Sequence, residues 1–233
     1  MTKAAQTDSP YRVVFDLDDT LYAERDFAIS GFRAAGAFAE TQWGMDDPVS
    51  HMTELLDSGH LGKLFKLTLE HFKDTVSDDD LTQFVDVYRR HDPDIDLHDD
   101  AREALDVAKS YGPIGLITDG THALQRNKVA ALGIESEFHT IVYTGALGKR
   151  REFHKPHPRA FEIMEEALGG DRHRLVYVGD NPAKDFIAPN QRGWLSVQIV
   201  RPNGIHDHTN IADGGEPHHR IHSLTELVGL LAE

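Results

Sequence analysis

The sequence predicts an α/β fold, in which a parallel β-sheet with helices on both faces is interrupted once by a helical insertion. Three observations support this prediction. Short apolar runs typical of buried strands recur along the chain. Helical patterns separate most of these runs, and strands that alternate with helices form parallel sheets. Residues 22–96 break the alternation, because they contain helical patterns and no convincing strand.

The predicted sheet has five strands, at 11–14, 113–117, 140–143, 175–178 and 194–200. Helices are predicted between them at 99–110, 122–132 and 159–168. Gly133 is expected to follow the last turn of the second helix, where the left-handed conformation favours glycine. The C-terminal stretch 223–231 opens with the capping box of Ser223 and Glu226. Its leucines and Val228 form one apolar stripe, which predicts core packing.

The helical insertion predicts a second domain. Its helices are expected at 27–43, 49–56, 61–75 and 78–90. We therefore predict a core made of residues 1–21 and 97–233, with residues 22–96 as an inserted cap. The insertion contains 16 acidic and 7 basic residues, which we interpret as a solvated helical surface.

The composition excludes several classes of function. A formal charge of −15 argues against nucleic acid or an anionic membrane as partner, because both require a basic surface. The absence of cysteine excludes disulfides, thiolate metal sites and a cysteine nucleophile, and it fits the reducing cytoplasm in which we expect the protein to act. The first ten residues are polar, so no signal peptide is expected. No apolar run approaches the roughly 20 residues of a membrane helix.

The most informative motif is FDLDDT, residues 15–20, directly after the first predicted strand. Asp16 and Asp18 come where that strand would end, and ligands of open parallel sheets bind outside the carboxyl ends of the strands. Two carboxylates this close repel each other unless a cation joins them, and Mg²⁺ prefers oxygen ligands. The motif therefore predicts a magnesium site, with an Asp-rich turn as the alternative. For Asp19 we expect a turn or cap role.

Two polar segments follow the next strands. Thr118, Asp119 and Gly120 precede a predicted helix, so a hydroxyl, free N–H groups and a helix N-terminus predict an anion site. An ordinary helix cap is the alternative. Lys155 lies beside a proline in the segment HKPHP and could neutralise a phosphate and a carboxylate together. A surface lysine is the alternative there.

A last acidic segment, GDNPAKD, follows the strand predicted at 175–178. Gly179 is expected to permit a tight turn. Asp180 and Asp185 add carboxylates to a site that already has two. Four polar segments thus fall at the carboxyl ends of separate predicted strands, which is far less probable by chance than any one of them.

This ordered set of motifs resembles that of the haloacid dehalogenase (HAD) superfamily, and the resemblance covers nearly the whole chain from Arg12 to Val200. It implies a three-layer α/β/α Rossmann-like core, and the insertion resembles the family's small α-helical cap. The founding dehalogenases lack a carboxylate at the position of Asp18, so this residue favours the phosphatase branch.

The resemblance also implies roles for the motif residues. Asp16 would be the nucleophile and Asp18 the general acid/base. Thr118 and Lys155 would hold the phosphoryl group, together with the backbone amides of residues 119 and 120, which are Asp119 and Gly120. Asp16, Asp180 and the backbone carbonyl of Asp18 would bind Mg²⁺. Asp185 would orient Lys155 or a metal-bound water.

The function expected from these residues is that of a Mg²⁺-dependent phosphatase, which hydrolyses a small phosphorylated metabolite through an aspartyl-phosphate intermediate. A phosphosugar mutase on the same scaffold and a non-enzymatic phosphate-binding protein are the alternatives, although a pure binder has no need of Asp18. Dehalogenase activity is a more distant one. The candidate substrate contacts in the insertion are Arg25, His60, Lys63 and Lys66, with solvated helix charges as the alternative interpretation.

The chain also contains 15 histidines, several of them between residues 206 and 222. Their spacing is irregular. We therefore interpret this region as a solvated loop and not as a zinc site.

Overall fold

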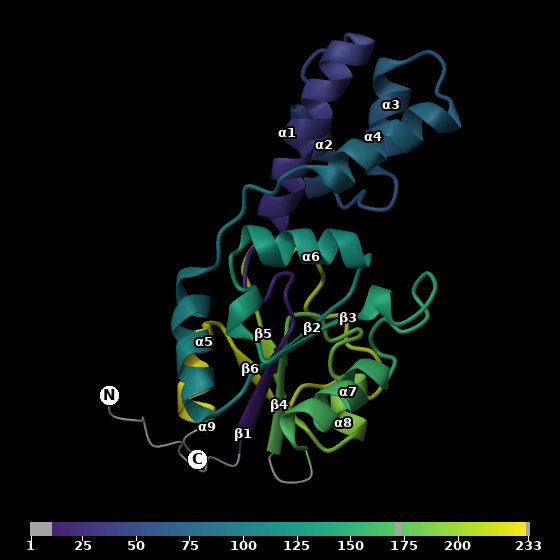
Figure 1. Ribbon diagram of the computed structural model, residues 1–233. Coiled ribbons are helices and arrows are strands. Elements are labelled where there is room, and N and C mark those ends of the chain that lie inside the picture. The colour runs from purple at the N-terminus through teal and green to yellow at the C-terminus, as the bar shows by residue number, and fades with distance from the viewer. Residues whose placement is uncertain (1–10, 171–173, 232–233) are drawn as a thin grey trace. The chain divides into compact units, whose positions relative to one another are not determined.

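The structure, a computed structural model, describes residues 11–170 and 174–231. The chain divides into two compact units. The first, here called the sheet unit, contains the residues up to Glu24 and those from Asp96 onward. The second, the helical unit, is Arg25–Ile95. Figure 1 labels their helices and strands.

The sheet unit is built on a parallel sheet, which has six strands within the described residues, in the order β3-β2-β1-β4-β5-β6. The strands are β1 (Tyr11–Phe15), β2 (Gly115–Thr118), β3 (Thr140–Tyr143), β4 (Arg174–Gly179), β5 (Leu195–Ile199) and β6 (His219–Ile221). Central β1 pairs in parallel with β2 and β4. Since all neighbouring pairs are parallel, the carboxyl ends of the strands meet at one edge of the sheet, and the predicted α/β fold is confirmed.

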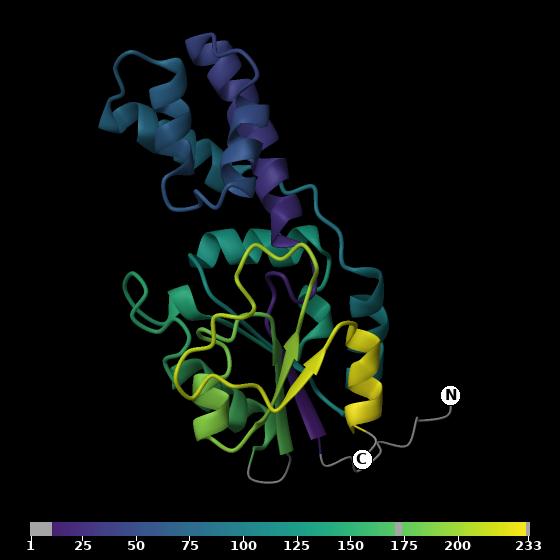
Figure 2. The same ribbon diagram turned by 180° about the vertical axis from the view of Figure 1, so that it is seen from behind.

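Helices cover both faces of the sheet (Figures 1 and 2). One face carries α5 (Asp99–Tyr111) and α9 (Leu227–Leu231), and the other carries α7 (Arg159–Leu168) and α8 (Ile187–Gln191). Val14 and Tyr177 of the sheet belong to the same cluster of buried hydrophobic residues as Phe161 of α7. Val13 and Phe15, the neighbours of Val14, are also fully buried, as expected for a strand covered on both faces. The three-layer arrangement implied by the resemblance is thereby confirmed.

The structure corrects three details of the sequence interpretation. Residues His219–Ile221, interpreted as part of a loop, form strand β6, which pairs with β5. The short helix α8 was not predicted. The predicted C-terminal helix begins instead as a 3₁₀ turn at Leu224–Glu226 and continues as α9, although its capping box is present as expected.

The helical unit contains α1 (Glu24–Trp43, whose first residue belongs to the sheet unit), α2 (Pro48–Asp57), α3 (Leu64–Phe72) and α4 (Asp78–Arg90). Its aromatic side chains pack against one another. The centroid of the Phe65 ring lies 5.4 Å from that of Phe84 and 4.8 Å from that of Tyr88. A capping box of Ser77 and Asp80 starts α4. The third predicted helix, at 61–75, is shorter than expected at both ends.

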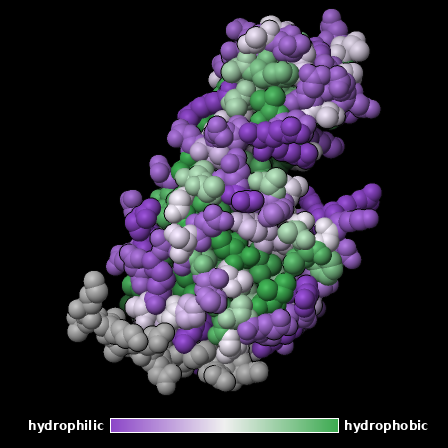
Figure 3. All heavy atoms as spheres, in the orientation of Figure 1, coloured by the Kyte–Doolittle hydropathy of each residue, from purple (hydrophilic) through white to green (hydrophobic). Residues whose placement is uncertain are grey.

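The surface shows polar and apolar residues side by side. On the face in Figure 3, hydrophilic residues surround a smaller area of hydrophobic ones in the middle of the sheet unit. Of the described residues, the large hydrophobic side chains that are clearly exposed are Leu61 and Ile211. None of the helices in the described part of the chain has the length and apolar character required to span a bilayer.

Candidate active site

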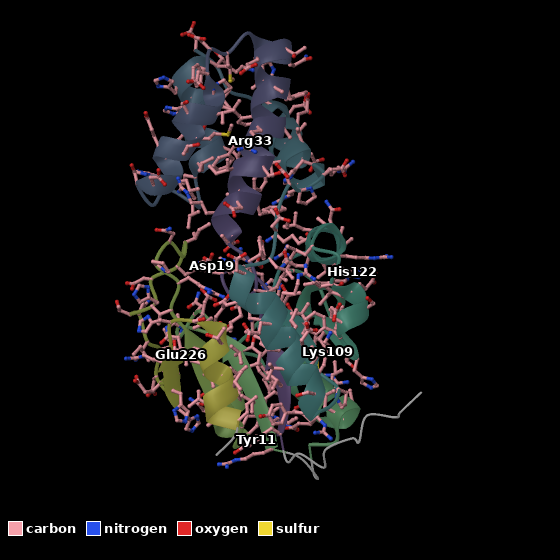
Figure 4. The ribbon with its side chains drawn as sticks, turned by 90° about the vertical axis from the view of Figure 1, so that its left-hand side faces the viewer. Tyr11, Asp19, Arg33, Lys109, His122 and Glu226 are labelled. Carbon is pink, nitrogen blue, oxygen red and sulfur yellow. The ribbon has the colours of Figure 1, made fainter. Side chains whose placement is uncertain are left out.

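The FDLDDT motif lies at the carboxyl end of central strand β1, beyond which Figure 4 labels Asp19, with Tyr11 at the opposite end of the strand. Asp16 is buried, and its N–H donates to the carbonyl of Val178 at 2.8 Å, which extends the β1–β4 pairing. Asp19 has a φ of 51°, and its carboxylate accepts from the N–H groups of Glu24 and Ile205, at 2.9 and 2.6 Å. The turn role predicted for Asp19 is confirmed.

A buried lysine connects the carboxyl ends of β1 and β4. The ammonium of Lys155 lies 2.7 Å from Asp16 Oδ1 and 2.8 Å from Asp185 Oδ1, and it donates to the Tyr177 hydroxyl at 2.9 Å. Its side chain is fully buried, so the surface-lysine alternative is wrong. Burial alone would lower the pKa of Lys155. The neighbouring Asp16, Asp185 and Tyr177 outweigh this effect and raise the pKa well above its usual value.

Three buried carboxylates gather at the same place. They belong to Asp16, Asp180 and Asp185, and one carboxylate oxygen of each residue lies within 4.8 Å of those of the other two. Burial raises the pKa of Asp16 to about 7, against the opposing effect of Lys155. Burial and the neighbouring carboxylates raise the pKa of Asp180 well above its usual value. Burial therefore disfavours the ionised forms of Asp16 and Asp180.

Gly179 serves this cluster in a way that the sequence interpretation did not anticipate. It belongs to strand β4 and its backbone is not in the left-handed region, so it makes no tight turn. A Cβ at this position would lie 2.7 Å from Asp185 Oδ2. The glycine is required because the carboxylate of Asp185 approaches the strand closely, and that carboxylate also accepts from the N–H of Asn181 at 2.9 Å.

Asp18 occupies a separate environment. Its Oδ1 lies 2.6 Å from the Lys128 ammonium and accepts from the Tyr22 hydroxyl at 2.5 Å, while its Oδ2 accepts from Gln125 Nε2 at 2.8 Å. Burial would raise the pKa of Asp18, but Lys128 and the hydrogen bonds outweigh it and lower the pKa. The Asp18 side chain does not belong to the cluster of Asp16, Asp180 and Asp185. The backbone carbonyl is therefore the part of Asp18 that could join the predicted metal ligands.

Thr118 and Asp119 lie at the end of β2. The Thr118 hydroxyl is buried and accepts from Gln125 Nε2. The Asp119 carboxylate accepts from the Thr144 hydroxyl at 2.8 Å and from the N–H of Lys155 at 3.1 Å. Asp119 therefore uses its side chain to hold the segment that carries Lys155, in addition to the backbone role predicted for it and for Gly120.

Sequence reasoning missed four residues that surround these groups: Tyr22, Gln125, Lys128 and Lys184. Lys184 lies 3.4 Å from Asp119, and neighbouring carboxylates raise its pKa although burial and Lys155 oppose them. One signal was available in helix α6 (His122–Ala131), where polar Gln125 and Lys128 are three positions apart, on the face that also carries apolar Val129.

The chain is similar in sequence to known hydrolases. The family model of haloacid dehalogenase-like hydrolases matches residues 12–191. Glyceraldehyde 3-phosphate phosphatase of Methanocaldococcus jannaschii is 25% identical over 232 residues, which cover 94% of this chain and 96% of that protein. Phosphoserine phosphatase of Thermus thermophilus is 31% identical over 106 residues, covering 45% of this chain and 41% of that protein.

Solved structures show the same fold. The putative HAD-hydrolase YfnB from Bacillus subtilis, bound to magnesium, matches with a TM-score of 0.68 and 16% identity, over 96% of this chain and 99% of that one. A 2-haloacid dehalogenase from Pseudomonas syringae matches with a TM-score of 0.63 and 23% identity, over 95% and 98% of the two chains. At these identities the likeness concerns the fold alone.

Proposed function

The chain belongs to the haloacid dehalogenase-like hydrolases, and from this premise we propose that it is a Mg²⁺-dependent phosphatase acting on a small phosphorylated metabolite through an aspartyl-phosphate intermediate. The observation that carries the proposal is a pair of carboxylates, Asp16 and Asp18, in two separate environments at the carboxyl edge of the sheet. Phosphatases among the relatives support the same substrate class. A nucleophile and an acid/base require such distinct surroundings.

In the proposed reaction, an oxygen of Asp16 attacks phosphorus in line while the bond to the leaving oxygen breaks. Asp18, in its protonated form, gives its proton to the leaving alkoxide. Water then attacks the phosphorus of the aspartyl-phosphate, and ionised Asp18 takes the proton of that water. Phosphate leaves and Asp16 is regenerated. Lys128 favours the ionised form of Asp18 that this second step uses.

The anionic phosphoryl group requires partners at the same edge of the sheet. Lys155 lies against Asp16 and supplies a positive charge there. The Thr118 hydroxyl and the backbone amides of Asp119 and Gly120 would donate to the non-bridging oxygens. Phosphoryl transfer depends mainly on such positioning and on charge stabilisation.

The residues present fit a divalent cation. Carboxylate oxygens are the ligands that Mg²⁺ prefers, and Asp16, Asp180 and Asp185 bring three of them within 4.8 Å of one another. Asp16, Asp180 and the backbone carbonyl of Asp18 would hold the ion. When bound, it would offset the repulsion between the nucleophile and the phosphate.

We expect hydrolysis of a chromogenic phosphate ester to be lost in excess EDTA and restored by added Mg²⁺, because the acidic cluster needs a cation to accept an anionic substrate. The measurement is the release of free phosphate before and after chelation. Untreated enzyme passed through the same buffer exchange is the control. Full activity in excess EDTA would contradict the magnesium requirement, and release of an isomerised sugar phosphate in place of free phosphate would indicate a mutase.

We also propose that the helical unit acts as a cap that selects the substrate. The two segments that join it to the sheet unit lie side by side, since Tyr22 bridges to Leu97 and the N–H of His98 donates to the Leu21 carbonyl at 2.9 Å. Tyr22 also donates to Asp18, so the connection to the helical unit begins at the proposed acid/base.

Replacing Lys63 and Lys66 of the helical unit with serine should change the ratio of kcat/KM between metabolite phosphates and a small chromogenic ester, because a selecting cap contacts the part of the substrate beyond the phosphate. Kinetics on a panel of phosphorylated metabolites measure this ratio. Arg102→Ser, at an exposed position of α5, is the control. Ratios that stay unchanged would count against these lysines as selecting residues.

A further inference from the structure

Helix α6 buries two polar side chains. Gln125 and Lys128 are only 1% and 2% exposed. Burying an amide or an ammonium costs free energy unless partners compensate for the lost water. Apolar side chains at these positions would avoid that cost, so the polar partners of Gln125 and Lys128 indicate what these two side chains do. Both residues contact Asp18.

Gln125 links two proposed functional groups. Its Nε2 donates to Asp18 Oδ2 at 2.8 Å and also to the Thr118 hydroxyl oxygen. The amide has two N–H hydrogens, so both are used, and the reverse orientation would turn its carbonyl oxygen toward a carboxylate. Since Thr118 accepts from Gln125, its own hydrogen points away from Gln125. The Thr118 hydroxyl would donate that hydrogen to a phosphoryl oxygen.

Lys128 holds the other oxygen of the same carboxylate. Its ammonium lies 2.6 Å from Asp18 Oδ1, and its Nζ is 5.8 Å from the centroid of the Tyr22 ring, whose hydroxyl also donates to Oδ1. With Gln125 on Oδ2, helix α6 contacts both oxygens of Asp18. A carboxylate held at both oxygens has a fixed orientation.

We propose that Gln125 and Lys128 are positioning residues for phosphoryl transfer. Lys128 and Gln125 orient the Asp18 carboxylate toward the leaving oxygen and the incoming water, and Gln125 makes the Thr118 hydroxyl a donor to the phosphoryl group. This inference rests on the proposed function and adds a helix that the four motifs do not include.

The test compares two esters, one with an alkyl leaving group that requires a proton and one with an activated aryl leaving group that does not. Lys128→Met should lower kcat/KM for the alkyl ester by roughly 10-fold to 100-fold more than kcat/KM for the aryl ester, because kcat/KM reports phosphoryl transfer to Asp16 and only the alkyl leaving group needs a proton in that step. Lys128→Arg should restore part of the loss. Gln125→Glu, which places an acceptor against Asp18, should lower kcat/KM with the same preference and raise KM for both esters.

Arg126→Met, at an exposed position of the same helix, should leave both activities unchanged, and thermal melting of every variant monitors the fold. The conservative Lys128→Arg and Gln125→Glu variants keep the test valid where Lys128→Met does not fold. Equal losses for the two esters, or none, in folded variants would overturn the inference. A wild-type protein that hydrolyses neither ester would instead contradict the proposed function itself.

Discussion

Asp16→Asn is expected to abolish turnover. The amide is too weak a nucleophile to attack phosphorus, and removal of a covalent nucleophile costs several orders of magnitude in kcat. The substitution preserves the shape of the side chain, so the core around β1 should be retained. The measurement is kcat on a chromogenic phosphate ester, with thermal melting to show that the variant is folded.

The control for this variant is Asp99→Asn, the same chemical change at an exposed position in the first turn of α5. It should leave kcat at the wild-type value. A preparation free of host phosphatases is essential, since trace contamination imitates residual activity. Near-normal kcat in Asp16→Asn would remove Asp16 from the role of nucleophile.

Asp18→Asn is expected to slow turnover of alkyl phosphates by roughly 10²-fold to 10⁴-fold, the usual contribution of a general acid/base. The asparagine keeps the size of the side chain, but its amide group replaces one accepting oxygen with a donor and has no acidic proton to exchange. The loss should be smaller for esters whose leaving groups depart without a proton. Values of kcat/KM across esters of graded leaving-group pKa measure this dependence, because kcat/KM reports the step in which the leaving group departs. A loss of kcat/KM of equal size throughout would mean that Asp18 serves structure or metal binding.

The position of the site could be predicted from the sequence because its motifs directly follow apolar strands. Asp16, Thr118 and Asp180 each lie where a parallel strand ends, and parallel strands bring their carboxyl ends to one edge. The order of the polar segments along the chain therefore contained the information needed to gather them. Lys155 belongs to a loop, yet its motif sufficed to place it among the candidates.

The groups around Asp18 could not be predicted in the same way. Gln125 and Lys128 lie more than 100 positions from Asp18 in the chain, and only the packing of α6 brings them to it. Their place on the apolar face of the α6 pattern indicates burial, but it does not identify Asp18 as their partner. Strand β6 escaped prediction because His219 and Arg220 are polar and exposed, and the strand exists through its pairing with β5.

Transfer of the phosphoryl group to Asp16 is tested most directly by trapping it. Asp18→Asn mixed with an activated aryl ester should form the aspartyl-phosphate without an acid and hydrolyse it slowly without a base, so the intermediate should accumulate. Acid quenching, borohydride reduction and peptide mass mapping would then locate the acyl phosphate. The predicted result is modification at Asp16, absent from the Asp16→Asn protein. Turnover of the ester with no trapped phosphoryl group, or a group trapped on another residue, would contradict the covalent mechanism.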